Sequence, residues 1–222
     1  MSSFPQHSAP PFEPAPTPDA APALWDSVSV SWRGRRLLRG FSHVARAGGI
    51  IGVIGAGGRD LDITLLTLAA RRPPTSGTVT IAGAPDSVAV ARLSSMPIDD
   101  PLTTVGESLR TVTPRAPQAN SAEIMRWAAI TAGSLDLVDR PWADLTPGQR
   151  VRAGLACALS SGAAVIAANA ADVSTPAEMA DVWSAITTMA SSGRILLIGW
   201  PTPTAHMSAT ATLLAAAPEG LR

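Results

Sequence analysis

The sequence predicts an α/β fold with a mainly parallel core sheet, and three observations carry this prediction. A β-branched apolar run at 49–54 leads through a glycine-rich loop into a helical pattern. Two further apolar runs, at 164–168 and 195–198, each follow a helical stretch. Near the N-terminus, residues 28–32 alternate between apolar and polar, which is typical of a half-exposed strand. Strands that alternate with helices favour parallel pairing, because a helix makes each return crossing.

The N-terminal elements are predicted from loop composition, alternation and turn residues. Residues 1–23 include seven prolines among alanines and serines, so we expect a disordered tail that cannot bury enough apolar area to become ordered. A single domain is expected at 24–222. The strand at 28–32 is followed by a predicted turn at 33–36 and a second short strand at 37–41.

The remainder of the chain alternates between helical and strand patterns. The expected elements are a helix at 61–70, a strand at 78–81, helices at 105–111, 121–133 and 147–160, a strand at 164–168, a helix at 176–191, a strand at 195–198 and a last apolar run at 210–216. The three helices in the middle predict an inserted helical subdomain at about 102–159.

Composition and charge exclude several functional classes. The 17 basic and 17 acidic side chains balance, which argues against a nucleic-acid partner because such proteins carry a basic excess. Every basic residue is an arginine, so no lysine can serve in catalysis. The single cysteine, Cys157, excludes an internal disulfide and fits a reducing compartment. Since no apolar run approaches the roughly 20 residues of a membrane span and no secretory signal is evident, we expect a cytoplasmic protein.

Several segments, in order along the chain, resemble the motifs of ATP-binding cassette (ABC) nucleotide-binding domains. The strongest is the run Leu145-Thr146-Pro147-Gly148-Gln149, similar to the family signature L-S-G-G-Q and likewise followed by basic residues and an alanine-rich helix. Residues 48–55 resemble the strand that enters the Walker A loop, and 74–79 resemble the segment after the Walker helix. Residues 165–168 match the family's Walker B strand. The resemblance implies a P-loop NTPase-like cassette with a parallel core, a small N-terminal antiparallel part and an inserted helical subdomain.

The Walker A positions depart from the family pattern. Such a loop needs glycine N–H groups around the phosphates, a lysine that reaches the β- and γ-phosphates, and a Ser or Thr hydroxyl on Mg²⁺. The loop glycines are Gly55, Gly57 and Gly58. By the resemblance, Leu61 stands at the lysine position and Asp62 at the Ser/Thr position. Arg59 is the candidate substitute for the lysine, but the neighbouring aspartates are nearer partners for its charge.

The other catalytic positions are replaced as well. The resemblance puts the Walker B aspartate at Asn169, the catalytic glutamate at Ala170 and the switch histidine at Trp200. Within the signature, Pro147 removes a backbone donor. Trp32 follows the first strand, where the family stacks adenine on an aromatic side chain; a tryptophan packed on the turn is the competing interpretation. We expect no resident metal cluster, and ATP with Mg²⁺ is implied by the resemblance alone.

The leading hypothesis is a degenerate ABC transporter ATP-binding subunit that is catalytically inactive. The resemblance implies that it pairs with a second cassette, as a homo- or heterodimer, and docks on an integral-membrane permease. Such a subunit would lie at the inner face of the cell membrane as a structural or regulatory partner. Two alternatives stay open. One is a subunit that binds or hydrolyses ATP weakly, with Arg59 in place of the lysine. The other is a soluble cassette-fold binding module unrelated to transport.

Overall fold

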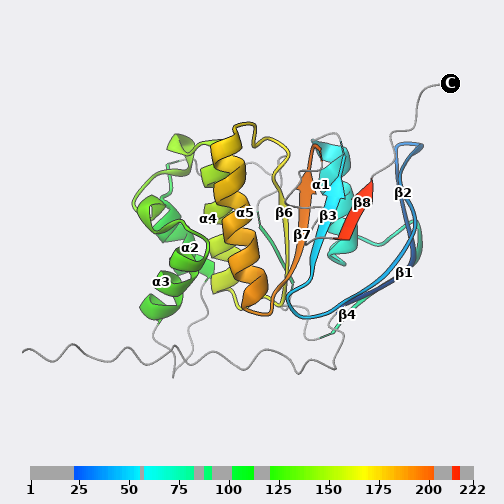
Figure 1. The fold of residues 1–222 in the computed structure, drawn as a ribbon, viewed down its shortest axis with the longest axis horizontal. Coiled ribbons are helices and arrows are strands. Elements are labelled where there is room, and N and C mark those ends of the chain that lie inside the picture. The colour runs from blue at the N-terminus through cyan, green and yellow to red at the C-terminus, as the bar shows by residue number, and fades with distance from the viewer. Residues whose placement is uncertain are drawn as a thin grey trace, which may run out of the picture.

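The computed structural model describes residues 23–55, 58–82, 88–91, 102–112, 121–202 and 212–215. These residues form two sheets and a group of helices (Figure 1). Residues 1–22 of the predicted tail and Gly57 of the glycine loop lie outside the described residues. Ala23, the last residue of the predicted tail, is instead buried and pairs with Ala45 in a strand.

A five-stranded parallel sheet forms the centre of the molecule, as predicted. Its strands are β3 (Ile50–Ile54), β5 (Val88–Val90), β6 (Val165–Asn169), β7 (Ile195–Trp200) and β8 (Thr212–Ala215). The strand order is β5-β6-β7-β3-β8, and all neighbouring strands run parallel. Every residue of β6 and β7 is buried. Other elements cover both faces of the sheet, which is why these strands are uninterrupted apolar runs in the sequence.

A three-stranded antiparallel sheet, with strand order β2-β1-β4, packs beside the parallel one. It consists of β1 (Ala23–Trp32), β2 (Arg35–Ala45) and β4 (Ser76–Ile81). The predicted four-residue turn at 33–36 is wrong, because Trp32 already pairs with Arg35. Arg33 and Gly34 have φ angles of 49° and 76°, and positive φ at both positions is the conformation of the tight two-residue hairpin.

The helices agree with the predictions within about two residues at most ends. They are α1 (Arg59–Leu68), α2 (Val105–Val112), α3 (Ser121–Thr131), α4 (Pro147–Ser160) and α5 (Pro176–Ser191), with 3₁₀ turns η2 (Leu135–Leu137) and η3 (Trp142–Asp144). Helix α1 lies two residues earlier than predicted, because Gly58 is its N-cap and Ala70, with φ of 53°, ends it in the left-handed region. None of the described helices is long and apolar enough to cross a membrane.

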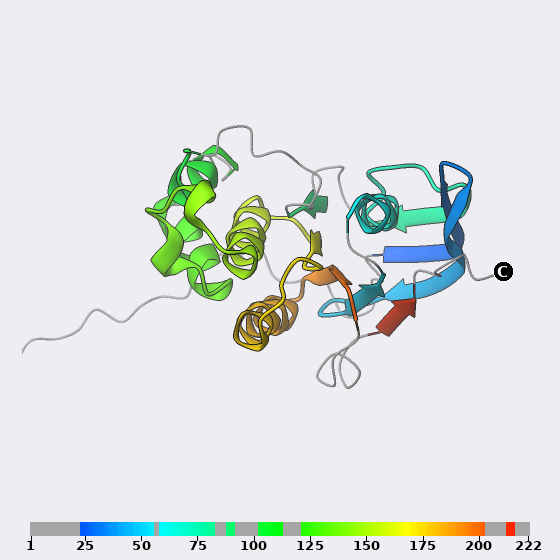
Figure 2. The same ribbon diagram turned by 90° about the horizontal axis from the view of Figure 1, so that it is seen from above.

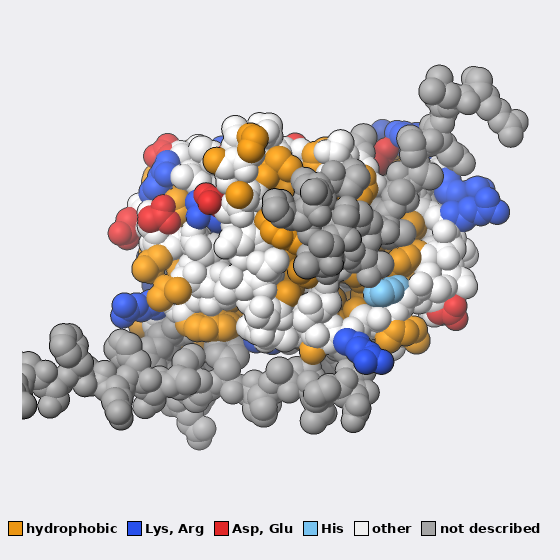
Figure 3. All heavy atoms as spheres, viewed as in Figure 1, with side chains coloured by type: hydrophobic (Ala, Val, Ile, Leu, Met, Phe, Trp, Pro, Cys, Tyr) orange, Lys and Arg blue, Asp and Glu red, His pale blue; other side chains and the backbone are white. Residues whose placement is uncertain are grey.

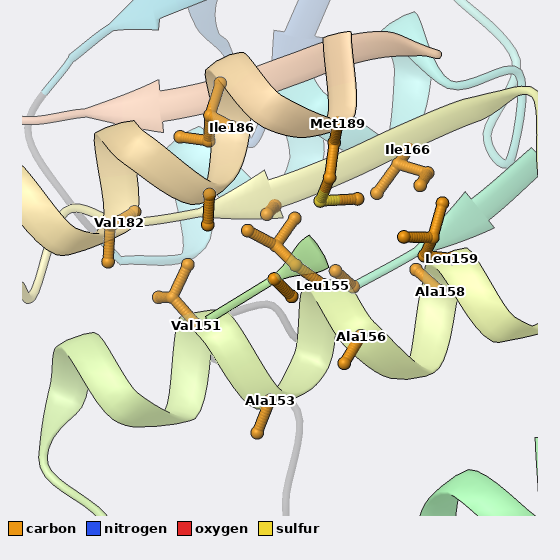
Figure 4. Close-up of a cluster of buried hydrophobic side chains, with 14 of the residues drawn as sticks. Val151, Ala153, Leu155, Ala156, Ala158, Leu159, Ile166, Val182, Ile186 and Met189 are labelled. Carbon is orange, nitrogen blue, oxygen red and sulfur yellow. The ribbon is translucent and has the colours of Figure 1, made fainter. Parts of the chain in front are cut away.

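Two buried apolar clusters lie on opposite faces of the parallel sheet. Helices α4 and α5 pack on one face, and α1 with the antiparallel sheet packs on the other (Figure 2). Between α4 and α5, Val151 and Leu155 point toward Ile186 and Met189, and all four side chains are buried (Figure 4). This packing fixes the position of the N-termini of α4 and α5 relative to the sheet.

Candidate functional site

The candidate site lies at the carboxyl ends of β3, β6 and β7, where open parallel sheets commonly bind ligands. The N–H of Gly55 donates to the carbonyl oxygen of Trp200 at 3.0 Å. The N–H of Ala170 donates to the carbonyl oxygen of Gly199 at 2.9 Å. The backbone therefore brings together the glycine loop, the two Walker B positions and the switch position, although 145 residues separate Gly55 from Trp200.

Asp62 and Asn169 form a buried hydrogen-bonded pair between α1 and β6. Asn169 Nδ2 donates to Asp62 Oδ1 at 2.7 Å, and the two residues are only 6% and 1% exposed, respectively. The N–H of Ala171 donates to Asn169 Oδ1 at 2.9 Å, which fixes the orientation of the side-chain amide. The Asp62 carboxylate, on the helix after the glycine loop, is thus bound by the Asn169 amide of the neighbouring strand.

Leu61 fills the space between α1 and β7. The residue is 1% exposed, so its side chain lies in the core and offers no charge to a phosphate. A Cβ atom on Gly199 would lie 2.9 Å from Leu61 Cδ2 and 3.0 Å from Leu65 Cδ1. Because β7 approaches α1 this closely, only glycine fits at position 199 while Leu61 keeps its place.

Ala170 and Trp200 belong to one buried apolar cluster. They are 0% and 1% exposed, and both lie on the α4–α5 side of the sheet. The indole Nε1 of Trp200 has no hydrogen-bond partner among the described residues. Neither an alanine nor an indole can serve as a general acid or base at neutral pH. The two positions that the resemblance assigns to a catalytic glutamate and a switch histidine are therefore occupied by core residues.

The signature segment is held by contacts within the chain. Thr146 and Gln149 form a capping box at the start of α4, so the N–H groups of both residues are already bonded. Pro147 occupies the first helical position and has no N–H. The Thr146 hydroxyl donates to the carboxylate of Glu178, and a Cβ atom on Gly148 would lie 2.8 Å from Glu178 Cβ. The N-terminus of α4 thus already carries a negative partner.

Trp32 is surrounded by arginines, which the sequence did not predict. The guanidinium carbons of Arg72, Arg59 and Arg33 lie 4.6, 5.7 and 5.8 Å from the centroid of its ring. The expectation that Arg59 pairs with a neighbouring aspartate is wrong: Arg35 Nη1 binds Asp60 Oδ2 at 2.7 Å instead. The hairpin places Arg35 beside α1, and Arg59 turns to the indole.

The residues of the candidate site that sequence reasoning missed are Glu178, Arg33 and Arg72. Glu178 follows Thr175 by three residues, and this spacing is the helix-start pattern that could have drawn attention to it. Nothing in the local sequence connects Arg72 to Trp32, because their contact depends on how β1 and β4 pair.

Within the described ranges, no three His, Cys, Asp or Glu side chains are grouped to hold a metal ion. Burial raises the pKa of the Cys157 thiol to about 12, so the thiol is protonated at neutral pH.

No family model and no curated protein sequence matches this chain. Solved structures match over most of its length. An ABC transporter ATP-binding protein from Pyrococcus furiosus has a TM-score of 0.68 at 16% identity, covering 87% of this chain and 96% of that one. The protein cbiO1 from Clostridium perfringens, part of the ABC transporter complex cbiONQ, has a TM-score of 0.63 at 17% identity, covering 82% and 79%. A nucleotide-free ATP-binding cassette from an ABC transporter has a TM-score of 0.68 at 15% identity, covering 87% of both chains. The chain therefore has the fold of an ABC transporter ATP-binding cassette.

Proposed function

We propose that this protein is a non-hydrolysing cassette subunit of a transporter complex. The observation that carries the proposal is the burial of the catalytic positions: Leu61, Ala170 and Trp200 are each at most 1% exposed. A catalytic site needs charged and protonatable groups that face the ligand. In this chain the corresponding positions contribute to the core instead, so the loss of activity is built into the packing.

Hydrolysis would need a cation at the phosphates, a metal ligand set and a base for water. The cation is replaced by Leu61 and the base by Ala170. Asp62 is the remaining carboxylate at the metal position, and Asn169 donates to it at 2.7 Å. Arg59 does not replace the lysine, since its guanidinium lies over Trp32. No residue of the described chain supplies the missing functions in their place.

The signature segment is equally unsuited to complete a site on a partner cassette. In the resemblance, this helix N-terminus would offer its N–H groups to the partner's nucleotide. Here Thr146 and Gln149 use theirs in the capping box, and Pro147 has none. The carboxylate of Glu178 bonds the Thr146 hydroxyl and would repel a phosphate. These contacts support a structural or regulatory role and not a share in a composite catalytic site.

Exposed apolar side chains on the helical side of the molecule support a protein partner there (Figure 3). Leu102, Ile130, Leu135 and Val112 are 75%, 53%, 50% and 41% exposed. The cassette-fold relative cbiO1 is described as part of a transporter complex. By this analogy, the surface of α2 and α3 contacts a membrane permease, and a second cassette pairs with the opposite part of the chain.

The test of inactivity is Mg²⁺-dependent ATP binding and hydrolysis by the full chain. Isothermal titration is expected to give no Mg²⁺-dependent binding at about 1 mM ATP, and a phosphate-release assay is expected to give no turnover above the protein-free rate. Saturable Mg²⁺-dependent binding below about 100 μM, or sustained phosphate release, would overturn the proposal and support the weakly active alternative.

The test of the transporter role is fractionation of the protein in its native cells. We expect the wild-type chain to sediment with membranes, and the double variant Ile130→Glu/Leu135→Glu to move to the soluble fraction. The matched control is Leu24→Glu/Val44→Glu, which places the same charges on an exposed cross-strand pair of the antiparallel sheet. Loss of membrane association in both variants, or in neither, would contradict docking through the helical side.

A further inference from the structure

Three guanidinium groups converge on one indole at the edge of the antiparallel sheet. The guanidinium carbons of Arg33, Arg59 and Arg72 all lie within 6 Å of the Trp32 ring centroid, at the distances given above. None of the three arginines forms an ion pair with a carboxylate within the described part of the chain. Arginine side chains gather at the same edge in the space-filling view, around the β1–β2 hairpin (Figure 3).

Three separate segments of the chain build this cluster. Arg33 belongs to the two-residue turn after Trp32, and Arg59 is the first residue of α1. Arg72 lies on the segment that returns from α1 to β4. That segment is fixed to β1, because the N–H of Ser31 donates to Thr75 Oγ1 at 2.8 Å and the N–H of Thr75 donates to the carbonyl oxygen of Ser29 at 2.8 Å. The arrangement is therefore set by backbone pairing and helix position.

The cluster has a local excess of positive charge in a chain whose net charge is zero. Arg35 lies beside it and is neutralised by Asp60 through a bridge of 2.7 Å. The three arginines on Trp32 remain, and their mutual repulsion is relieved only by solvent or by an anion. Stacking on an indole holds a guanidinium by its face and leaves the in-plane N–H groups free to bind phosphate oxygens.

We propose that Trp32 with Arg33, Arg59 and Arg72, here called the arginine cage, binds a compact oligophosphate. The group is either a free oligophosphate or the phosphate chain of a nucleotide, since both present closely spaced anionic oxygens that suit several guanidinium groups at once. Arg72 lies over the Trp32 ring at 4.6 Å, so a base that stacked on the same face would have to displace its guanidinium. Of the four cage residues, only Arg59 belongs to the loop that resembles Walker A, and the other three come from the β1–β2 hairpin and the segment after α1.

The experiment is isothermal titration of the full chain with sodium tripolyphosphate in Mg²⁺-free buffer. We expect saturable binding with a dissociation constant of about 0.1 mM or below at low salt. The affinity should fall several-fold between about 50 and about 200 mM NaCl, and it should fall further when Mg²⁺ neutralises the ligand. ATP in the same Mg²⁺-free buffer should bind with similar affinity if its phosphate chain is recognised, and adenosine should not compete.

The triple variant Arg33→Ala/Arg59→Ala/Arg72→Ala should lose about tenfold in affinity for each arginine removed. The matched control Arg39→Ala/Arg110→Ala/Arg126→Ala removes the same charge from exposed positions away from Trp32, and it should bind like the wild type. Circular dichroism on both variants checks that they fold.

Four outcomes would overturn the proposal: no tripolyphosphate binding by the wild type, equal losses in the two triple variants, competition by adenosine, or tighter binding of a single-stranded oligonucleotide than of tripolyphosphate. Because the cage should bind without Mg²⁺, this result is independent of the hydrolysis test. The two proposals can therefore fail separately. Sustained ATP hydrolysis would contradict the proposed function, and a lack of tripolyphosphate binding would contradict the arginine cage.

Discussion

Two regions of this cassette fold differ in the burial and the charge of their side chains. At the carboxyl ends of the parallel strands, Leu61 and Trp200 are buried, and the polar residues Asp62 and Asn169 satisfy each other. At the edge of the antiparallel sheet, three arginines, of which Arg33 and Arg59 are exposed, surround Trp32. The first region therefore belongs to the buried core, whereas the three arginines of the second have no carboxylate partner among the described residues. The proposed loss of hydrolysis concerns the first region, and the proposed phosphate binding concerns the second.

Replacing Leu61 by lysine tests how tightly the region around α1 and β7 is packed. Leu61→Lys should destabilise the protein by about 3–5 kcal/mol, because an ammonium group would lie where the present side chain is 1% exposed and in close contact with β7. Urea unfolding followed by circular dichroism measures the loss. The control Leu66→Lys on the same helix is half-buried and should cost less than about 2 kcal/mol, since its ammonium can reach water. Equal costs, or stabilisation of the Leu61→Lys variant by Mg-ATP, would mean that the site is still open.

The buried polar pair gives the next effect. Asn169→Asp puts a second carboxylate against Asp62 Oδ1 and should cost about 2 kcal/mol at pH 7. The cost should shrink as the pH falls toward about 5, because one proton shared between the two oxygens removes the repulsion. The swap Asp62→Asn/Asn169→Asp restores one amide and one carboxylate and should recover most of the stability. If the swap were as unstable as the single variant, the pair would matter through shape and not through charge.

Glu178 tests whether the α4 N-terminus has a permanent internal partner. Glu178→Ala removes the acceptor of the Thr146 hydroxyl and a carboxylate near two helix N-termini, so we expect a loss of about 1 kcal/mol in the free energy of unfolding. Asp181→Ala is the control on the same helix. Asp181 is 61% exposed in its side chain and only 4.0 Å from Arg152, so its loss should cost at most about 0.5 kcal/mol. Similar losses of unfolding free energy in the two variants would mean that the Glu178 carboxylate does not stabilise the N-terminus of α4.

The fold was predictable because its signals are local and repeated. The buried strands are continuous apolar runs, and the Thr-Pro starts of α4 and α5 fix two helices to the residue. The three-residue β5 was missed, since so short a strand has no period to detect. The predicted turn at 33–36 was too long because arginine is not expected at positive φ, yet Arg33 adopts it.

The sequence predicted where the candidate residues lie in the fold, but it did not predict their burial or their hydrogen-bond partners. The spacing of the motifs located Leu61, Asn169 and Trp200, and the structure places them around one end of the sheet. Burial and partners could not be derived from spacing. Asp62 and Asn169 are 107 residues apart, and their hydrogen bond depends on how α1 packs on β6. The arginine cage depends likewise on the return of the chain from α1 to β4.

The smallest expected effect is that of Trp200→Phe, with Trp25→Phe as its comparison, because these two fully buried tryptophans differ in one hydrogen bond. Trp25 Nε1 donates to the carbonyl oxygen of Leu68 at 2.8 Å, whereas Trp200 Nε1 has no partner among the described residues. Trp25→Phe should therefore cost about 2–3 kcal/mol, from lost packing and an unpaired buried carbonyl. Trp200→Phe loses similar packing but also removes an unsatisfied donor, so its net cost should stay within about 1 kcal/mol. Urea unfolding of the two variants, measured together, gives the two losses of unfolding free energy. A Trp200→Phe cost equal to that of Trp25→Phe would reveal a partner for the indole at the switch position, and that region would then retain a polar role.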